Sequence, residues 1–384
     1  MEQIKLKRIS IVVSISLVLS LMTNTVSIAA VKSGGGCSKL GSTTTSGGYQ
    51  YACIKSGKKL IWKKGVAVKK PTPIATPTPI ATPTPTQIQI SIDNLDLKGV
   101  PQKAYDNVIK VLKSSPRASF GPTKFIGPNV LQARANQEIA GLERAVDLWA
   151  PYFLPNKFHV VYATDGDEDW LETKSSELGF GSMVPPGQTW RMWMKRYNPC
   201  AGAVAGSGNN IPTFVQCLGR PYSGGVKQTG PHEYTHLFQI HYGGTNINRI
   251  PWYTEGSASY FGWTLGFYPT DSNLGERSSW ISSLYGNLSA EVKSDFQSKD
   301  LQKFKNRLRV LTHSLDQSIA NTSYWVGGLA TEVLVALYGF DKFVEFTKNI
   351  QSNSNMSSLL MQTYGFDEDY FYEKLAPYVW AQIP

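Results

Sequence analysis

Residues 229–244 read TGPHEYTHLFQIHYGG, the pattern of a helix that binds a metal ion. His232 and His236 are four residues apart, so on a helix both imidazoles project from the same face and can bind one ion. Thr229 is expected to cap the helix, Pro231 is tolerated in its first turn, and two consecutive glycines end it. The buried side of this helix is expected to consist of Leu237, Phe238 and Ile240.

Two histidines alone do not hold a catalytic zinc ion, which needs a third protein ligand and one open position. A longer histidine motif would place its third histidine at position 242, where this chain has Tyr242. The neighbouring His241 lies nine positions after His232, on the opposite side of a helix, so we interpret it as a surface histidine. The alternative third ligand is a carboxylate from a following helix.

Residues 251–262, PWYTEGSASYFG, predict that following helix. Proline opens it, Glu255 lies in its first turns, and apolar residues at helical spacing come after. Eighteen residues separate His236 from Glu255, which is enough for the rest of one helix, a turn and an antiparallel return. Glu255 is therefore the expected third ligand.

The sequences HEYTH, which contains both histidines, and WYTEG, which contains Glu255, together resemble the gluzincin metallopeptidases, namely the thermolysin-like and aminopeptidase-N-like families. The resemblance covers roughly residues 130–350. It implies that a Zn²⁺ ion is held by His232, His236 and Glu255. It also implies that Glu233 is the catalytic base that takes the proton of the attacking water.

A third stretch, residues 323–340, reads SYWVGGLATEVLVALYGF and has an apolar helical pattern. Aminopeptidase-N-like enzymes are similar there, with Tyr-x-x-Gly opening a helix and the tyrosine hydroxyl directed at the oxyanion. This resemblance implies that Tyr324 stabilises the transition state. The alternative is that Tyr324 belongs to the core, as aromatic residues that open helices usually do.

One departure from the aminopeptidases bears on the expected activity. Those enzymes carry an upstream glutamate that binds the substrate amine, whereas residues 201–206 here read AGAVAG and contain no acid. Thr254 also stands where family members often have asparagine. The missing acid favours endopeptidase activity over aminopeptidase activity.

The resemblance implies an α+β fold, a zincin-like, two-lobed metallopeptidase with a mixed sheet and the active-site helix followed by a helical lobe. Local patterns add a helix at 136–154 and strands at 158–163 and 213–218. The second strand is expected to pair with an extended peptide, as sheet edges do. The aspartates between 165 and 169 lack the glycine and glutamate of a calcium loop, so they are expected to open a helix.

Composition divides the chain into segments. Residues 1–30 have the basic start, short apolar run and small-residue exit of a cleaved signal peptide, and no other stretch is apolar enough to span a membrane. The repeat PTPIATPTPIATPTPT predicts a semi-rigid linker over residues 71–87. A small module at 31–70 precedes this linker, and the gluzincin-like domain at 88–384 follows it.

Four cysteines in an exported chain are expected to form two disulfides. Sequence neighbours favour Cys37 with Cys53 and Cys200 with Cys217, out of three pairings that four cysteines allow. The first would staple a β-hairpin in the module at 31–70. This module, with its Cys-Ser-Lys-Leu-Gly start, resembles short Cys-Lys-Leu-Gly modules of exported actinobacterial proteins.

The formal net charge of +10 is concentrated near the N-terminus. Residues 31–70 contain nine lysines and no acidic residue, whereas the large domain is close to neutral. A neutral main domain argues against nucleic-acid binding. The basic module is expected to be either an anchor to an anionic wall or surface polymer, or a solvated spacer.

Together these features predict a secreted zinc peptidase, extracellular or associated with the cell wall, that hydrolyses peptide or protein substrates as an endopeptidase. The alternative is a non-catalytic protein that binds the cell surface or wall and has a structural or degenerate zinc site. The three ligands and the base are all present in the sequence, which favours the enzyme.

Overall fold

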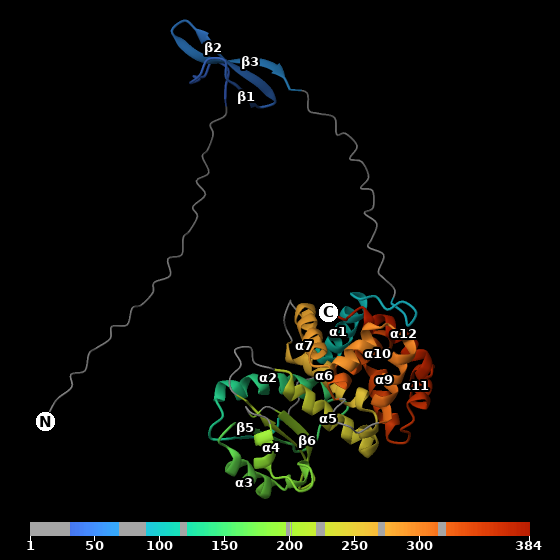
Figure 1. Ribbon diagram of the computed structural model, residues 1–384. Helices are drawn as coiled ribbons and strands as arrows, with labels where there is room; N and C mark the ends of the chain where they lie inside the picture. Colours follow the sequence, from blue (N-terminus) through green and yellow to red (C-terminus); the bar gives the residue numbers. More distant parts are fainter. Residues whose placement is uncertain are drawn as a thin grey trace, which may run out of the picture. The chain divides into compact units, whose positions relative to one another are not determined.

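The computed structural model describes residues 31–68, 90–115, 121–196, 200, 202–219, 227–267, 273–313 and 320–384. The expected signal peptide and linker lie outside these residues. The chain divides into two compact units, Met1–Thr86 and Gln87–Pro384 (Figure 1). Within the described residues, we find no helix with the length and apolar character that crossing a membrane requires.

The small unit is a three-stranded antiparallel sheet rather than the expected hairpin. Its strands, in spatial order, are β1 (Thr43–Ser46), β2 (Tyr49–Ser56) and β3 (Lys59–Ala67). Gly47 and Gly48 both have positive φ and form a tight turn between β1 and β2, which adds the strand that was not predicted. The disulfide Cys37–Cys53, as expected, fastens the preceding segment to β2.

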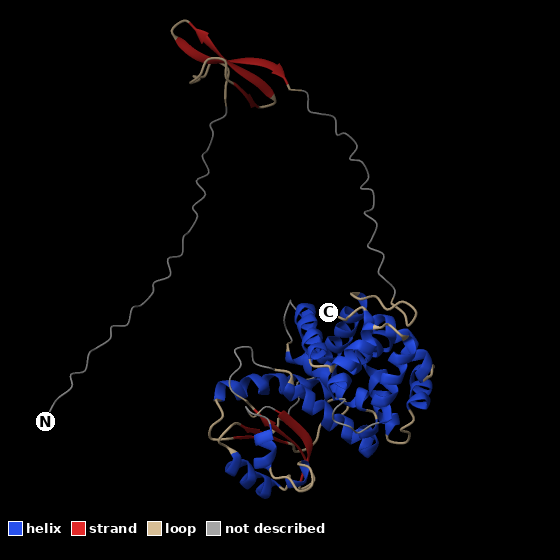
Figure 2. Ribbon diagram, viewed as in Figure 1, coloured by secondary structure: helices blue, strands red, loops and turns tan. Residues whose placement is uncertain are grey.

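The large unit is mostly helical, and its strands gather on one side of it (Figure 2). The strands are β4 (Thr123–Ile126), β5 (His159–Ala163), β6 (Gly202–Gly208) and β7 (Ile211–Cys217). The helices are α1 (Gly99–Ser114), α2 (Gln132–Trp149), α3 (Glu168–Leu178), α4 (Trp190–Arg196), α5 (Thr229–Gly243), α6 (Pro251–Gly266), α7 (Asn273–Gly286), α8 (Ala290–Gln297), α9 (Leu301–His313), α10 (Ala320–Ile350), α11 (Met356–Tyr364) and α12 (Glu368–Trp380), with 3₁₀ helices at Gly181–Met183 and Gly244–Arg249. The expected mixed α+β class is confirmed.

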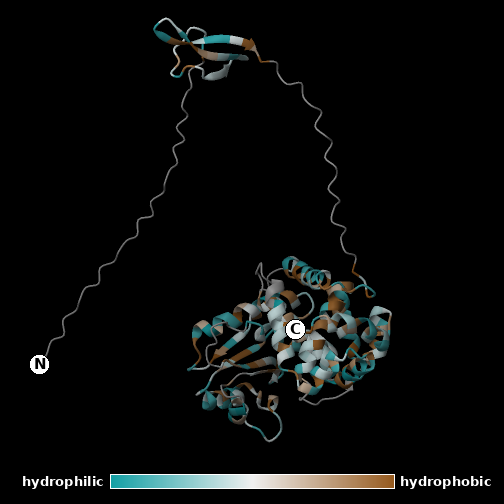
Figure 3. Ribbon diagram, turned by 45° about the horizontal axis from the view of Figure 1, so that its top comes forward, coloured by the Kyte–Doolittle hydropathy of each residue, from teal (hydrophilic) through white to brown (hydrophobic). Residues whose placement is uncertain are grey.

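The strands of the large unit form one sheet in the order β4-β5-β7-β6. The first three strands are parallel, and β6 is antiparallel to β7. β5 is buried along its whole length because its alternate side chains enter two cores. Val160 and Tyr162 belong to the core that includes α2 and α5, and Val161 and Ala163 belong to the core that includes α3 and α4. The strands of this sheet include hydrophobic segments, drawn brown in Figure 3.

Two of the elements predicted from the sequence need correction. The predicted strand at 213–218 exists as β7, but it lies between β5 and β6, so it is not an edge that can pair with a peptide. Among the described strands, β6 is the edge on that side. The predicted helix at 136–154 is α2, which begins at Gln132 and ends at Trp149, shortly before a proline at 151.

Trp149, the last residue of α2, is completely buried and joins four helices. Its ring stacks on Phe238 of α5, with 3.9 Å between the ring centroids. It also contacts Phe261 of α6 and Phe340 of α10, each with 5.0 Å between centroids. This aromatic cluster fixes α5 and α6, the two helices that carry the expected metal ligands, against each other.

Candidate metal centre

Helices α5 and α6 bring the three expected ligands together. Nε2 of His232 lies 3.0 Å from Nε2 of His236, and Oε2 of Glu255 lies 3.5 Å from each of these nitrogens. A tetrahedral ion with bonds of about 2.0–2.2 Å needs ligand atoms roughly 3.3 Å apart. The observed spacing is close to this value, and the three side chains could hold a metal ion.

Glycines allow the helices around the site to approach closely. A Cβ atom on Gly262 of α6 would lie 2.8 Å from the carbonyl oxygen of Gln228 and 3.1 Å from Cβ of His232. A Cβ atom on Gly256 would lie 2.2 Å from the carbonyl carbon of Gly327 in α10. Helix α6 is therefore packed tightly between α5 and α10, and nearly all of its residues are buried.

The start of α5 differs from the prediction. Thr229 is the first helical residue rather than the cap, and Gln228 at the cap position makes no side-chain hydrogen bond. The buried carboxyl group of Glu138, on α2, lies near this end of α5: burial raises its pKa, and the backbone of Gly230 is among the groups that oppose the rise. A carboxylate at this end of a helix interacts favourably with the helix dipole. The acidic group near the start of α5 therefore comes from a residue distant in sequence.

The outer side of α5 is exposed to solvent. His241 is exposed, as expected for a surface histidine, and does not join the metal ligands. Ile240 is 43 % exposed, so the prediction that it belongs to the buried side is wrong. Leu237 and Phe238 are buried as predicted. The helix ends at Gly243, and the next residue, also glycine, has a positive φ of 56°.

The ligands and Glu233 strongly affect one another's ionisation. Burial alone would lower the pKa of His236, but the charge of Glu255 and its hydrogen bond, together with the charge of Glu233, raise it to about 9. Burial alone would raise the pKa of Glu255, but His236 and His232 reverse this effect and hold it well below its ordinary value. The site thus favours positive charge on His236, and a metal cation would replace the proton there.

A cavity of about 430 Å³ opens beside His232, the one of the three expected ligands that lines it. His232, Glu233 and Tyr324 are among the residues that line it. Glu233 is only 6 % exposed, and burial raises the pKa of its carboxyl group against the opposing charges of the two histidines. The ring centroid of Tyr324, near the start of α10, lies 5.9 Å from that of His232. Glu233, the expected base, and Tyr324, the expected oxyanion donor, therefore line the same cavity as His232, one of the expected metal ligands.

Gln239, three residues after His236, has a role at the site that was not predicted from the sequence. Its Nε2 donates hydrogen bonds to the carbonyl of Thr254 at 3.0 Å and to the hydroxyl of Ser257 at 2.7 Å. Because both amide hydrogens are used, Oε1 must accept a hydrogen from Nδ1 of His236, which lies 2.8 Å away. This fixes the tautomer of neutral His236 and leaves Nε2 as the atom that could bind a metal ion.

Replacing Gln239 with leucine is expected to weaken metal binding by about 10- to 100-fold. The side chain keeps its size but loses the acceptor that orients His236, so the imidazole can rotate or change tautomer. The affinity is measured by competition of Zn²⁺ with a chromophoric chelator, with Gln302→Leu on the exposed face of α9 as the control. Equal zinc affinities for Gln239→Leu and the wild type would show that Gln239 does not position the ligand.

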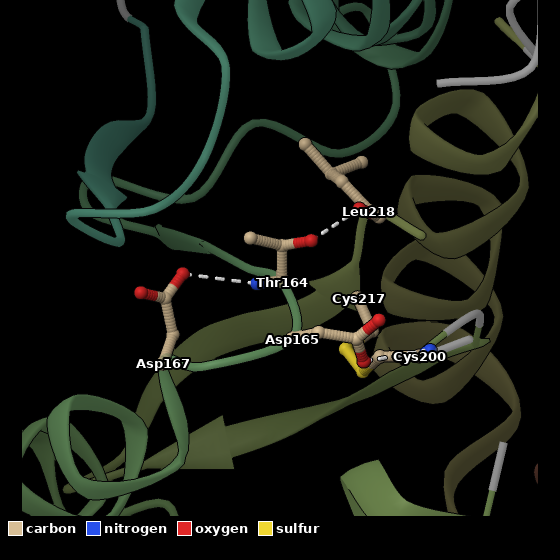
Figure 4. The surroundings of a disulfide bond; sticks show 6 residues. All are labelled: Thr164, Asp165, Asp167, Cys200, Cys217 and Leu218. Atoms are coloured by element: carbon tan, nitrogen blue, oxygen red, sulfur yellow. Dashed lines mark hydrogen bonds between the residues drawn. A yellow bond between two sulfur atoms is a disulfide. The ribbon is translucent and has the colours of Figure 1, made fainter. Parts of the chain in front are cut away.

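The aspartates between 165 and 169 have structural partners. Asp165 accepts a hydrogen bond from the backbone N–H of Cys200 at 3.0 Å, and Asp167 accepts one from Thr164 at 3.0 Å (Figure 4). Asp169 lies in the first turn of α3, as predicted for acidic residues that open a helix. The disulfide Cys200–Cys217 is the favoured pairing, and it joins the segment before β6 to the end of β7.

Comparison of the chain with protein-family models, curated proteins and solved structures finds no match.

Proposed function

We propose that the chain is a zinc-dependent peptidase with a gluzincin-type active site and, around it, a zincin-like arrangement of two lobes. The observation that supports this most strongly is the convergence of His232, His236 and Glu255 at ligand spacing beside a cavity that Glu233 also lines. Glu233 is buried at this cavity and is not one of the three expected zinc ligands. A structural zinc site does not need such a glutamate, whereas a hydrolase needs it as a general base.

Zinc fits these residues better than other common metals. Two imidazole nitrogens and one carboxylate oxygen are the donor set of many catalytic zinc sites, whereas calcium and magnesium prefer oxygen ligands. The hydrogen bond between Gln239 and His236 is the outer contact that such histidine ligands usually have. With three protein ligands, one position remains for water or substrate.

The residues of the chain then divide the work of peptide hydrolysis. Zinc, when bound, supplies a Lewis acid that polarises the scissile carbonyl and acidifies a water molecule. Glu233 accepts the proton of the attacking water and passes it to the leaving amine. Tyr324 donates a hydrogen bond to the oxyanion that develops on the carbonyl.

The edge strand β6 is the proposed platform for an extended substrate. Gly202 and Ala203, at its start, line the cavity beside Glu233. An extended peptide can pair with such an edge through main-chain hydrogen bonds, which do not depend on the peptide's sequence. No acidic residue within β6 is available to bind a substrate amine, so we favour an endopeptidase.

Replacing Tyr324 with phenylalanine is expected to lower kcat for peptide hydrolysis by about 10- to 100-fold. The hydroxyl interacts with charge that exists mainly in the transition state, so KM and the zinc content should change little. Steady-state kinetics and metal analysis check this expectation, with Tyr370→Phe on the surface of α12 as the control. An unchanged kcat would show that Tyr324 has only a structural role.

We propose that the peptidase acts outside the cell, because its sequence has the features of an exported protein. The two disulfides fit an oxidising compartment. Exposed lysines on the small unit, such as Lys55, Lys59 and Lys63, suit contact with an anionic wall or surface polymer. No nucleic-acid partner is proposed, because the large unit is nearly neutral.

The alternative, a non-catalytic surface-binding protein with a structural or degenerate zinc site, makes a different prediction. Casein zymography with and without a chelator separates the two. A peptidase gives a cleared band that disappears with the chelator and returns with Zn²⁺. A binding protein gives no cleared band in either condition, even when it contains zinc.

A further inference from the structure

We infer that Arg134 binds a carboxylate group of the peptide substrate, an inference that rests on the proposed peptidase function. Arg134 is in the first turn of α2, and it is the one lysine or arginine among the described residues that line the cavity beside His232 and Glu233. Its side chain is 15 % exposed, so the guanidinium sits in the cavity wall rather than in bulk solvent.

The guanidinium of Arg134 is held in this wall by a buried acid. Its Nη1 lies 2.8 Å from Oε1 of Glu138, one helical turn later on α2, and Glu138 is completely buried. The side chain of Gln216 and the backbone of Gly230 also lie near this carboxyl group: burial raises its pKa, and Arg134, Gln216 and Gly230 oppose that rise. Glu138 therefore lies near both β7 and the start of α5, and it holds Arg134 close to the helix that carries the two histidines.

The guanidinium of Arg134 has more N–H groups than its contact with Glu138 uses. It has five N–H groups in a rigid plane, and Glu138 is the partner that we find for it among the described residues. Carboxylates are the groups that this planar donor pattern binds best, because two parallel hydrogen bonds can form. A substrate carboxylate is repelled by Glu233 on the same cavity and is attracted at Arg134.

Gln216 adds a matching acceptor next to Arg134. Gln216 lines the cavity, is 3 % exposed, and directs its amide N–H towards Glu138, since a carboxylate can only accept. Its Oε1 is buried and has no hydrogen-bond partner among the described residues. A buried acceptor of this kind gains from a ligand N–H. The guanidinium of Arg134 and Oε1 of Gln216 together suit a peptide residue that presents a carboxylate and a nearby backbone N–H.

The cavity lining also includes two large apolar side chains, Trp280 and Leu284 of α7, which do not suit a carboxylate. A lining that combines an arginine with apolar side chains suits a substrate with one charged and one apolar group. The carboxylate can be the C-terminus of the substrate or an Asp or Glu side chain, and the two sources are distinguished by experiment.

The test uses matched, internally quenched hexapeptides that carry Asp or Asn at one internal position and a free or amidated C-terminus. The full-length wild type is expected to cleave carboxylate-bearing peptides with a kcat/KM about 10- to 100-fold above that for their amide counterparts. Arg134→Gln should remove this preference by slowing only the carboxylate peptides. A preference for Asp over Asn identifies the side chain as the source, and a preference for the free C-terminus identifies the terminal carboxylate.

Two controls protect this test. Arg309→Gln, on α9 and outside the cavity lining, should keep the wild-type preference. The double variant Arg134→Gln/Glu138→Gln removes both charges of the buried pair and should lose the preference like the single variant, even if the single variant folds poorly. The thermal unfolding and zinc content of every variant are measured alongside.

Calorimetric binding of the same peptides separates this inference from the proposed function. If the wild type cleaves no peptide, the proposed function fails, but weaker binding of carboxylate peptides to Arg134→Gln by about tenfold or more would still support the inference. Equal behaviour of carboxylate and amide peptides with the wild type, or a preference that survives in Arg134→Gln, would overturn it.

Discussion

Replacing Glu233 with glutamine is expected to reduce peptide hydrolysis by about 10²- to 10⁴-fold, the range that a general base usually contributes. Glu233 is nearly buried, lines the cavity and follows the ligand His232 directly. Glutamine has the same shape but cannot accept the proton of the attacking water. The three ligands are untouched, so the zinc content should stay at the wild-type level. Casein cleavage and metal analysis of the purified variant measure both quantities.

The matched control for this variant is Glu143→Gln, on the exposed side of α2, where the side chain is 43 % exposed. It should cleave casein at the wild-type rate. If Glu233→Gln cleaved casein as fast as the wild type, the assignment of Glu233 as the base would be wrong. If Glu233→Gln lost its zinc, Glu233 would instead be needed to hold the metal site together.

Replacing Gly327 with alanine is expected to lower the free energy of unfolding by about 1–3 kcal/mol or more. A Cβ atom at this position would lie 1.9 Å from the carbonyl oxygen of Trp252 and 2.9 Å from Cα of Gly256. Both atoms belong to the backbone of α6, so no side chain can rotate to relieve the clash. Helices α6 and α10 must separate, which also moves Tyr324, on α10, relative to Glu255, the expected ligand on α6.

Denaturant unfolding of the metal-free protein measures this loss of stability. The control is Gly286→Ala at the end of α7, where a Cβ atom meets nothing within 4 Å. Alanine there should be neutral or slightly stabilising, because it reduces the freedom of the unfolded chain. Equal unfolding free energies for Gly327→Ala and Gly286→Ala would show that the close helix contact is not needed.

The residues that could hold a metal ion could be located from the sequence because the signal is local. Helical geometry makes His232 and His236 neighbours whatever the rest of the fold is. The prediction of Glu255 needed one further assumption, namely that the second helix returns antiparallel to the first. In the structure, the carboxylate of Glu255 lies 3.5 Å from Nε2 of both histidines. The two glycines that end α5 and the proline that opens α6 also lie at the observed limits of these helices.

Contacts between distant segments could not be read in the same way. The sequence predicts a strand at 213–218 but does not show which strands lie beside it, so the expectation that this strand is an edge is wrong: β7 lies between β5 and β6. Glu138, whose carboxyl group lies near Gly230 at the start of α5, is 92 residues away from it in sequence. Gln239 lies on the helix of the motif, yet its importance depends on α6, which supplies Thr254 and Ser257.

The measurement that tests the central claim most directly is a zinc titration of the chelator-treated protein, with cleavage of an unbiased peptide library recorded at each addition. We expect no cleavage before zinc is added, a rise in proportion to bound zinc, and a plateau at one equivalent per chain. Cleavage that is already complete in the metal-free protein, or a protein that binds one equivalent of zinc and cleaves no member of the library, would contradict the proposed function.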